Sequence, residues 1–319
     1  MSRALICGVG GQDGTYLAKL LLDKGYEVIG TSRDAMATSF GNLSRLDIRK
    51  HVRTVSMAIN DFRSVLSTIK NTQPDEIYNL AGQTSVGLSF DQPVETMESI
   101  AIGTLNLLEA IRFVEQPIRL YSAGSSECFG DTGKESATEK TPFQPRSPYA
   151  VAKVSAHGLV ANYRDAYNLF ACTGILFNHE SPLRPERFVT QKIVRTAARI
   201  ARGGGEKLHL GNLDIHRDWG WAPEYVEAMW LMLQQDQADD FVIATGRTVS
   251  LEYFVEKTFA HFGLDWHEYV VSDKSLLRPS DIQFGRGDPA KAIRLLGWQS
   301  KLDVDGVIGA MCEAALVEG

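Results

Sequence analysis

The chain has 319 residues, of which 44% are hydrophobic and 23% charged, and its formal net charge is −6. This length is enough to bury one large α/β unit or two lobes. The acidic balance gives no general attraction to nucleic acid or to an anionic membrane, so neither is expected as a partner and any phosphate site has to be local. Residues 1–30 lack the apolar core of a signal peptide, and no apolar run approaches the length of a membrane span.

The first half of the chain alternates strand and helix patterns. Short apolar runs predict strands at Arg3–Gly8, Glu27–Thr31, Val52–Met57, Glu76–Ala81 and Arg119–Ala123. Helical patterns lie between them at Gly14–Lys24, Arg63–Lys70 and Val94–Val114. Alternation of this kind predicts parallel βαβ units.

The second half is less regular. Ser147-Pro148 is typical of an N-cap followed by proline in the first turn of a helix. Further strands are predicted at Phe170–Phe177 and Phe241–Ala244, and further helices at Arg187–Ala201, Leu251–Phe262, Pro289–Leu296 and Val304–Val317. The pattern predicts an α/β fold, a Rossmann-type doubly wound parallel sheet with a smaller C-terminal substrate-binding lobe. We expect residues 1–178 plus about 212–248 to form the sheet domain, and 179–211 plus 249–319 to form the lobe.

The four cysteines, Cys7, Cys128, Cys172 and Cys312, are scattered and form no CxxC pair. Cys7 and Cys172 lie in apolar, strand-like runs and are expected to be buried thiols. This usage suits a reducing compartment and predicts a cytoplasmic protein.

A glycine-rich segment, Gly8-Val-Gly-Gly11-Gln-Asp-Gly14, follows the first predicted strand and opens the first helix. Gly8 permits a tight turn, Gly11 lets backbone N–H groups approach a pyrophosphate, and Gly14 permits close packing of the helix. A glycine-rich turn without a ligand is the alternative. The strand–turn–helix context favours a nicotinamide dinucleotide site.

The choice between NAD and NADP falls near residue 33, about 20 residues past the glycines. Arg33 can hold a 2′-phosphate, whereas Asp34 can accept from a free ribose hydroxyl; alternatively, both are solvated loop charges. Asn79-Leu80-Ala81-Gly82 follows a predicted strand and would cover the centre of the cofactor, although a plain turn after a strand has the same pattern.

Tyr149 and Lys153 lie four residues apart on the helix that Ser147 begins, so their side chains share one face. A lysine ammonium beside a phenol favours the phenolate, which would let Tyr149 act as a base near neutral pH. Such a pair is more often a surface pair. Here the preceding strand, the cap and the glycine segment favour catalysis, with Ser125 at the carboxyl end of the fifth strand.

Glu127 adds a second acid/base group, which simple hydride transfer does not need. Together with the Tyr149–Lys153 pair, it indicates an oxidation followed by another step on the same substrate. A loop carboxylate without a catalytic role is the alternative.

With these residues, the chain closely resembles the GDP-mannose 4,6-dehydratase family of the extended short-chain dehydrogenase/reductase superfamily. The resemblance runs almost end to end. Its most specific blocks are Gly174-Ile-Leu-Phe-Asn178-His-Glu-Ser-Pro182 and Arg217-Asp-Trp-Gly220, supported by Tyr78–Ala81, Pro145–Tyr149 and Arg278-Pro279.

The resemblance implies conversion of GDP-D-mannose to GDP-4-dehydro-6-deoxy-D-mannose, in deoxyhexose biosynthesis. Tyr149 would deprotonate the C4 hydroxyl while a hydride passes to NADP⁺, with Lys153 lowering the pKa of the phenol. Glu127 would remove the C5 proton, water would leave from C6, and the hydride would return there. Ser125 stands where the family usually has threonine and keeps a hydroxyl for the C4 oxygen.

The resemblance also implies the binding residues, and it implies no metal. For NADP, with NAD the less favoured cofactor, they are Gly8, Gly11, Gln12, Asp13, Gly14, Arg33, Leu80, Ala81, Tyr149 and Lys153. For the GDP-sugar they are Gln83, Ser85, Ser126, Asn178, Val189, Lys192, Arg217, Arg278 and Asp281. Asn178, Arg217 and Arg278 would hold the diphosphate, Val189 and Lys192 the guanine, and Asp281 the ribose. The alternatives are a helix-face charge for Lys192 and a loop ion pair between Arg217 and Asp218.

Several positions depart from the family pattern. The family usually has Arg-Arg in place of Arg33-Asp34, followed by a serine-rich loop that reaches a neighbouring subunit's cofactor, and Ala35–Asn42 differs from that loop. Ala58 replaces an aspartate that contacts adenine. Arg184–Arg187 departs from Arg-Gly-Glu-Thr, which bears on the sugar pocket.

Assembly and reaction keep alternatives at this stage. The resemblance implies a homodimer or homotetramer, with the helices Val94–Val114 and Pro148–Asn168 forming a dimer contact. The alternative functions are dehydration of a related GDP-sugar such as GDP-manno-heptose, a GDP-4-keto-6-deoxyhexose reductase or C4 epimerase, and a non-catalytic nucleotide-binding protein. Glu127 separates the dehydratase from the reductase and the epimerase, because neither needs a carboxylate for C5.

Overall fold

The computed structural model describes residues 1–277 and 280–317. Its centre is a seven-stranded sheet in the order β10-β6-β5-β4-β1-β2-β3, and each neighbouring pair is parallel. The strands are β1 (Arg3–Cys7), β2 (Glu27–Ser32), β3 (Arg53–Ser56), β4 (Glu76–Asn79), β5 (Arg119–Ala123), β6 (Ala171–Leu176) and β10 (Phe241–Ile243). The order reverses between β1 and β4, the point where doubly wound sheets bind ligands. The predicted fold class is confirmed.

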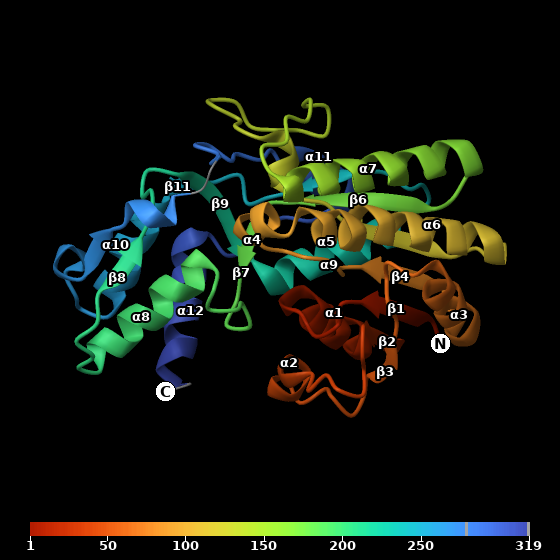
Figure 1. The fold of residues 1–319 in the computed structure, drawn as a ribbon, viewed down its shortest axis with the longest axis horizontal. Helices are drawn as coiled ribbons and strands as arrows, with labels where there is room; N and C mark the ends of the chain where they lie inside the picture. The colour runs from red at the N-terminus through yellow and green to blue at the C-terminus, as the bar shows by residue number, and fades with distance from the viewer. Residues whose placement is uncertain (278–279, 318–319) are drawn as a thin grey trace.

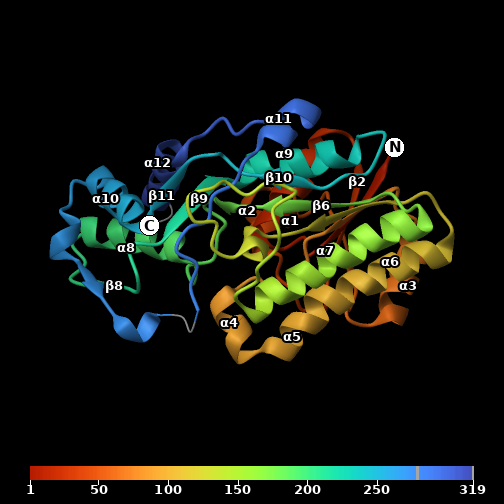
Figure 2. The ribbon, with the colours of Figure 1, turned by 90° about the horizontal axis from the view of Figure 1, so that it is seen from above.

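Helices cover both faces of this sheet (Figures 1 and 2). One face packs against α1 (Gln12–Asp23), α9 (Ala222–Leu233) and α11 (Ala290–Leu296). The other face packs against α3 (Phe62–Thr72), α6 (Gly103–Val114) and α7 (Pro148–Tyr167). The strands of the middle are therefore buried on both sides, which explains their continuous apolar runs.

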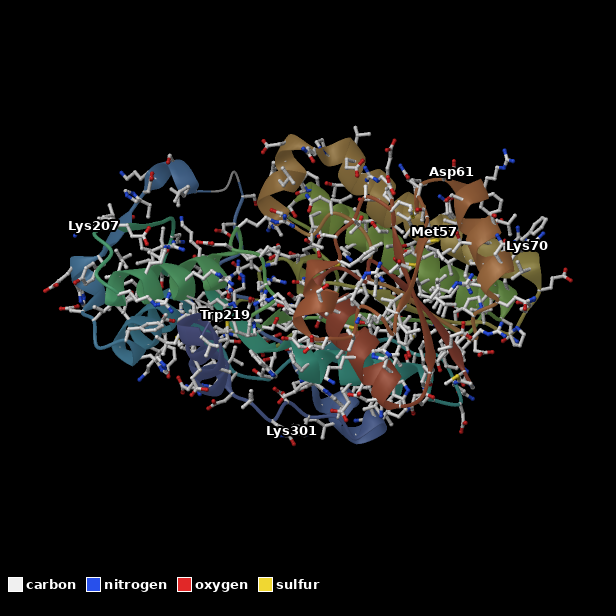
Figure 3. All side chains as sticks on the ribbon, turned by 90° about the horizontal axis from the view of Figure 1, so that it is seen from below. Met57, Asp61, Lys70, Lys207, Trp219 and Lys301 are labelled. Carbon is white, nitrogen blue, oxygen red and sulfur yellow. The ribbon has the colours of Figure 1, made fainter. Side chains whose placement is uncertain are left out.

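The C-terminal part forms a separate layer at one end of the molecule (Figure 1). It contains α8 (Val189–Ala201), α10 (Leu251–His261) and α12 (Val304–Val317), the small sheet β7 (Asn178–Glu180), β9 (His216–Trp221) and β11 (Thr248–Ser250), and the pair β8 (Leu208–Leu210) with β12 (Val270–Ser272). Its apolar core includes Trp219 (Figure 3), whose ring centroid lies 5.2 Å from that of Phe254.

Two helical segments differ from the sequence prediction. The segment predicted as one helix, Val94–Val114, is divided into α5 (Pro93–Met97), a π-helical turn at Glu98–Ile102 and α6. Helix α9 was not predicted, because its apolar side chains cover most of its circumference and hide the one-sided period of a surface helix. The short helices α2 (Gly41–Arg45) and α4 (Val86–Asp91), and 3₁₀ turns at Ser126–Phe129, Trp266–Glu268 and Lys274–Leu276, complete the described elements.

The start of α7 follows the prediction from Ser147-Pro148. The Ser147 hydroxyl accepts a hydrogen bond from the backbone N–H of Ala150 at 3.1 Å, and Pro148 occupies the first turn, where no backbone donor is needed. This cap fixes where α7 begins, and therefore where Tyr149 stands.

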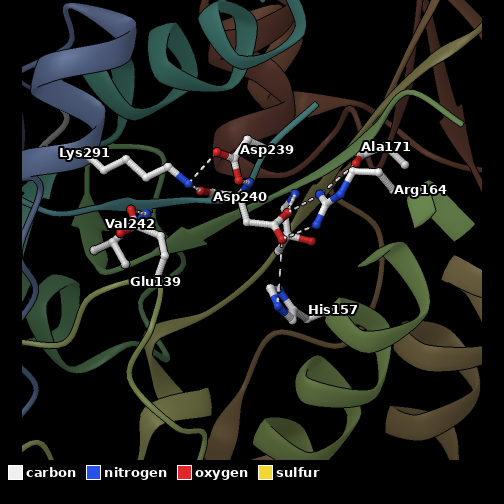
Figure 4. A network of polar contacts seen from close by, with 9 residues as sticks. Glu139, His157, Arg164, Ala171, Asp239, Asp240, Val242 and Lys291 are labelled. Atoms are coloured by element: carbon white, nitrogen blue, oxygen red, sulfur yellow. Dashed lines mark hydrogen bonds and ion pairs between the residues drawn. The ribbon is translucent and has the colours of Figure 1, made fainter. Parts of the chain in front are cut away.

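A network of polar contacts lies at the amino ends of β6 and β10 (Figure 4). The predicted site lies at the opposite, carboxyl edge of the sheet. Arg164 of α7 donates to both carboxylate oxygens of Asp240, at 3.0 and 2.8 Å, and to the carbonyl of Ala171. Glu139 accepts from the backbone N–H of Val242 at 2.7 Å, which covers an otherwise open strand edge. These charged groups thus anchor α7 and the edge strand.

Candidate active site

A cavity of about 390 Å³ lies at the carboxyl edge of the central sheet. Its lining includes Asp13 of the glycine segment and residues of the C-terminal part, whereas Gly8, Gly11, Gln12, Gly14 and Gln83 are not part of the lining. Among the sequence-predicted residues, the lining includes Asp13, Leu80, Ser85, Ser125, Ser126, Glu127, Tyr149, Lys153, Asn178, Val189, Lys192, Arg217 and Asp281. This volume is in the range of small-molecule sites.

The glycine segment has the geometry that a pyrophosphate needs. Gly8 has φ = +83°, and a Cβ on Gly14 would lie 2.4 Å from the carbonyl oxygen of Gly8, so a side chain there would push α1 off the loop. The backbone N–H of Gly11 closes the turn by donating to the same carbonyl at 3.1 Å. With α1 starting at Gln12, the loop fits an anion at the N-terminus of that helix.

The side chains of Gln12 and Asp13 connect the glycine segment to β7 and to Ser181, which follows it. The amide of Gln12 donates to the carbonyl of His179 at 3.2 Å and accepts from the hydroxyl of Ser181 at 2.8 Å. Asp13 faces the imidazole of His179 at 3.0 Å. The glycine segment is therefore bonded directly to the strand that carries Asn178.

Both ring nitrogens of His179 face acceptors. Nδ1 lies 2.7 Å from the carbonyl of Phe177, and Nε2 lies 3.0 Å from Asp13, so the doubly protonated imidazolium satisfies both. Burial alone would lower the pKa of His179, but the attraction to Asp13 outweighs it and the pKa is raised. Burial opposes ionisation of Asp13 as well, yet His179 and Gln12 lower its pKa to about 2.

We expect Asp13→Asn to destabilise the protein by about 3 kcal/mol near pH 6, since breaking a buried ion pair leaves one charge uncompensated. The folded pKa of His179 is raised above 6.5, so its contribution is complete below that pH and is lost as pH rises through the folded pKa. The contribution of Asp13 is lost only as pH falls toward about 2. Urea unfolding at pH 6 and at pH 9 measures the difference.

Asp23→Asn, in the exposed Lys19–Asp23 pair of the same helix, is the matched control. It should cost less than about 1 kcal/mol at both pH values. An equal loss of stability for Asp13→Asn at pH 6 and pH 9 would show that His179 is not charged in the folded protein.

The predicted catalytic residues come together around the end of β5. Nζ of Lys153 donates to the carbonyl of Ala123 at 2.6 Å and lies 5.7 Å from the ring centroid of Tyr149. The hydroxyl of Ser125 is near enough to Tyr149 to act on the pKa of the phenol, which it lowers. Ser125 also accepts from the backbone N–H of Glu127 at 3.3 Å, which starts the 3₁₀ turn that carries this carboxylate.

Burial sets the ionisation of this group in the structure. It raises the pKa of Tyr149 above its usual range, although the hydrogen bond from Ser125 acts in the opposite direction. It lowers the pKa of Lys153 to about 8. The sequence-based expectation of a phenol that ionises near neutral pH is not met here, because desolvation of Tyr149 dominates.

At the other end of the cavity, Arg217 is almost fully buried and its guanidinium is fixed by the strand and loop around it. It donates to the carbonyl of Ile282 at 2.8 Å and pairs with Asp281 at 3.3 Å. Asp218, considered as its partner from the sequence, accepts instead from Thr245 and Gly246. Arg217 and Asp281 thus present one polar unit to the cavity.

Other predicted residues have different positions. Lys192 lines the cavity and donates to the carbonyl of His209 at 2.6 Å. The amide of Gln83 is used within its own turn, where it bonds the carbonyl of Ser85 at 2.8 Å. Arg33 and Ala81 are not part of the cavity lining. Arg278 lies outside the described residues.

The cavity wall also contains polar and charged residues outside the predicted site set, among them His179, Glu180, Arg184, Arg187 and His209. Arg184 lies 3.3 Å from Glu180, with its guanidinium 3.9 Å from the centroid of the Phe188 ring. The polar run that follows β6 was the available signal, since the carboxyl ends of parallel strands face the site.

Two kinds of feature are absent from the described residues. None of their helices is long and apolar enough to cross a bilayer. Within residues 1–277 and 280–317, no group of three or more His, Cys, Asp or Glu side chains could hold a metal ion.

Three solved structures show how general the fold is. The Thermus thermophilus UDP-glucose 4-epimerase in complex with NAD matches with a TM-score of 0.86 at 24% identity, over 98% of each chain. A dTDP-glucose 4,6-dehydratase from Bacillus anthracis in complex with NAD matches at 0.85 and 20%, over 98% of this chain and 96% of that one. RMD from Pseudomonas aeruginosa complexed with NADPH matches at 0.82 and 21%, over 100% of each. At these identities the likeness concerns the fold alone.

Sequence comparison is more specific. The family model described as GDP-mannose 4,6 dehydratase matches residues 5–311. GDP-mannose 4,6 dehydratase 1 of Arabidopsis thaliana is 44% identical over 98% of this chain and 89% of its own length. The Yersinia enterocolitica GDP-mannose 4,6-dehydratase is 42% identical over 98% and 93%, and the human enzyme 42% over 98% and 90%. With this family match over most of the chain, and with Tyr149, Lys153 and Glu127 in one cavity, the chain belongs to the GDP-mannose 4,6-dehydratase family.

Proposed function

We propose that this protein is a lyase that converts GDP-D-mannose to GDP-4-dehydro-6-deoxy-D-mannose with the loss of one water. One observation carries the proposal: a single cavity contains the Ser125–Tyr149–Lys153 group, a second acid/base at Glu127, and the cationic end around Arg217. A reductase or an epimerase of GDP-sugars requires the first and the third of these, whereas elimination of water requires Glu127 as well.

Tyr149 takes the proton of the C4 hydroxyl as the phenolate, while Ser125 bonds the C4 oxygen. Because burial raises the pKa of Tyr149, this step requires the charge of Lys153 and the bound ligands to stabilise the phenolate. A nicotinamide dinucleotide, when bound, accepts the hydride of C4 and later delivers it to C6. The glycine segment, whose geometry fits a pyrophosphate, would hold it together with Leu80 and Ala81.

Glu127 then removes the C5 proton, which the C4 ketone makes acidic, and returns it to the departing C6 hydroxyl so that water leaves. Tyr149 releases to water the proton that it took from the C4 hydroxyl, and C5 takes one proton from water, which completes the 4-dehydro-6-deoxy sugar. Two protons are removed, from the C4 hydroxyl and from C5, and two are returned, to the leaving hydroxyl and to C5. The net change is therefore the loss of water.

For the nucleotide, we propose that Asn178 and Arg217 hold the diphosphate, that Val189 and Lys192 contact the guanine, and that Asp281 bonds the ribose. Asn178 of β7 lies directly opposite Trp219 in the register with β9, the strand that also carries Arg217. Paired cations and hydrogen bonds are needed there, because an unpaired buried diphosphate is costly to desolvate.

NADP is the proposed cofactor, with Arg33 as the residue that favours the 2′-phosphate. Structures of the same fold are described with NAD and with NADPH, so the fold accommodates both dinucleotides.

We further propose the division into 1–178 plus about 212–248 and 179–211 plus 249–319, although β9 within the first set pairs with β7 and β11. We also propose a homodimer through α5–α6 and α7, which is consistent with the exposed side chains of Val94, Ile102 and Val151. Sedimentation at several protein concentrations tests whether the protein is a dimer.

We propose a cytoplasmic location. All four cysteines are free and buried, as a cytoplasmic protein permits.

Incubating the purified protein with GDP-mannose and dinucleotide tests the function. The product should be lighter than the substrate by the mass of one water, with no net reduction of the dinucleotide. A product of unchanged mass would indicate an epimerase, and stoichiometric oxidation of a reduced dinucleotide would indicate a reductase.

Arg217→Ala should weaken binding of GDP by about 1.5–3 kcal/mol, because a charge-assisted hydrogen bond to the diphosphate is lost. Dinucleotide binding should not change, since Arg217 lies at the far end of the cavity. Calorimetric titration of GDP into the cofactor-loaded variant measures the loss. Titrating UDP and CDP into the wild type is the companion experiment, and equal affinity for UDP would mean that Val189 and Lys192 do not distinguish guanine.

A further inference from the structure

Arg33 and Asp34, the two charged residues of the loop that follows β2, have different partners. The carboxylate of Asp34 turns back into its own loop, where Oδ1 accepts from the backbone N–H groups of Met36 at 2.9 Å and Ala37 at 3.1 Å. The carbonyl of Asp34 accepts from the hydroxyl of Thr38 at 2.5 Å. This is the local bonding that aspartate commonly makes in turns, and it occupies Oδ1 of the carboxylate.

Tertiary contacts hold this loop in place over the glycine segment. The hydroxyls of Ser32 and Thr38 lie 2.8 Å apart. Phe40 is buried beside Gly10, and the amide of Asn42 donates to the carbonyl of Gly10 at 3.0 Å. Reorienting Asp34 toward a ribose would therefore disturb several bonds around the cofactor loop.

Arg33 points the other way and meets a different carboxylate. Its guanidinium lies 2.9 Å from Oε1 of Glu95, which belongs to α5 and is distant in the sequence. The side chain of Arg33 is 76% exposed and that of Glu95 is 42% exposed, so the 2′-phosphate of a dinucleotide can approach both. Glu95, and not the adjacent Asp34, is the acid in contact with the cation that is expected to select the cofactor.

We propose that Glu95 is a specificity-determining residue for the 2′ position of the dinucleotide. A carboxylate and a 2′-phosphate are both negatively charged at neutral pH, so they repel each other, and both accept hydrogen bonds, so they compete for Arg33. A free 2′-hydroxyl, in contrast, can donate to Glu95. Glu95 thus weakens the preference for NADP that Arg33 provides. This inference rests on the proposed use of a nicotinamide dinucleotide.

Two isosteric variants separate the two carboxylates. Glu95→Gln and Asp34→Asn each remove one negative charge near Arg33, and the asparagine side chain of the second variant keeps an oxygen that can accept from Met36 and Ala37. Protein stripped of nucleotide is titrated with NADP⁺ and with NAD⁺ by isothermal calorimetry, without any sugar nucleotide. Retained NAD⁺ binding shows that each variant is folded.

Glu95→Gln should tighten NADP⁺ binding about three- to tenfold and leave NAD⁺ binding the same or slightly weaker, the scale expected for a partly exposed charge facing a phosphate. Asp34→Asn should change the ratio of the two affinities by less than about twofold, because its charge already faces backbone donors. Arg33→Ala should weaken NADP⁺ binding and spare NAD⁺.

An unchanged ratio in Glu95→Gln, or a shift in Asp34→Asn that equals or exceeds it, would overturn the inference. Wild-type protein that binds neither dinucleotide would instead refute the proposed function. Wild-type protein that binds dinucleotide but fails to dehydrate GDP-mannose would leave the role of Glu95 to be decided by the same titrations.

Discussion

Replacing Glu127 by glutamine should slow dehydration by about 100- to 10,000-fold, the usual cost of losing one acid/base group. Glutamine keeps the shape of the side chain but cannot take the C5 proton or return a proton to the leaving hydroxyl. Binding of dinucleotide and of GDP should persist, because Tyr149, Lys153 and Arg217 are unchanged. Oxidation at C4 remains possible, so reduced dinucleotide should accumulate on the enzyme.

The measurements are turnover of GDP-mannose, exchange of the C5 hydrogen with solvent deuterium, and near-ultraviolet absorbance of the bound dinucleotide. Exchange should fall together with turnover. Glu135→Gln, an exposed glutamate further along the same loop, is the control and should turn over normally. An active Glu127→Gln enzyme with normal C5 exchange would assign the elimination to another base.

Tyr149→Phe should reduce turnover by a similar factor of about 100 to 10,000, but it should block an earlier step. Phenylalanine fills the same buried space between Ser125 and Lys153 and lacks only the oxygen that takes the C4 proton. No reduced dinucleotide should therefore accumulate, in contrast to Glu127→Gln.

The two variants are compared by mixing each with GDP-mannose and following the absorbance of the reduced dinucleotide. Tyr167→Phe, at the exposed end of the same helix, should behave as the wild type. Reduced dinucleotide in Tyr149→Phe would mean that another group accepts the C4 proton, and Tyr149 would then be a positioning residue.

Local patterns in the sequence predicted the framework of this site correctly. The alternation of apolar strands and helices indicated the doubly wound sheet, and the glycine segment indicated a tight turn at the start of α1. Ser147-Pro148 indicated where α7 begins, so the shared face of Tyr149 and Lys153 followed from the helical period. Each of these signals depends on residues a few positions apart, where sequence distance and spatial distance agree.

The sequence by itself therefore determined the sheet, the glycine loop and the Tyr149–Lys153 face, whereas the tertiary structure decided how these are charged and connected. Contacts such as Asp13 with His179, Arg217 with Asp281 and Arg33 with Glu95 join residues that lie far apart in the chain. The raised pKa of Tyr149 depends on burial, which is a property of packing. The physical reason is that charge pairing and desolvation are set by which groups meet in space, and no period in a single segment records that.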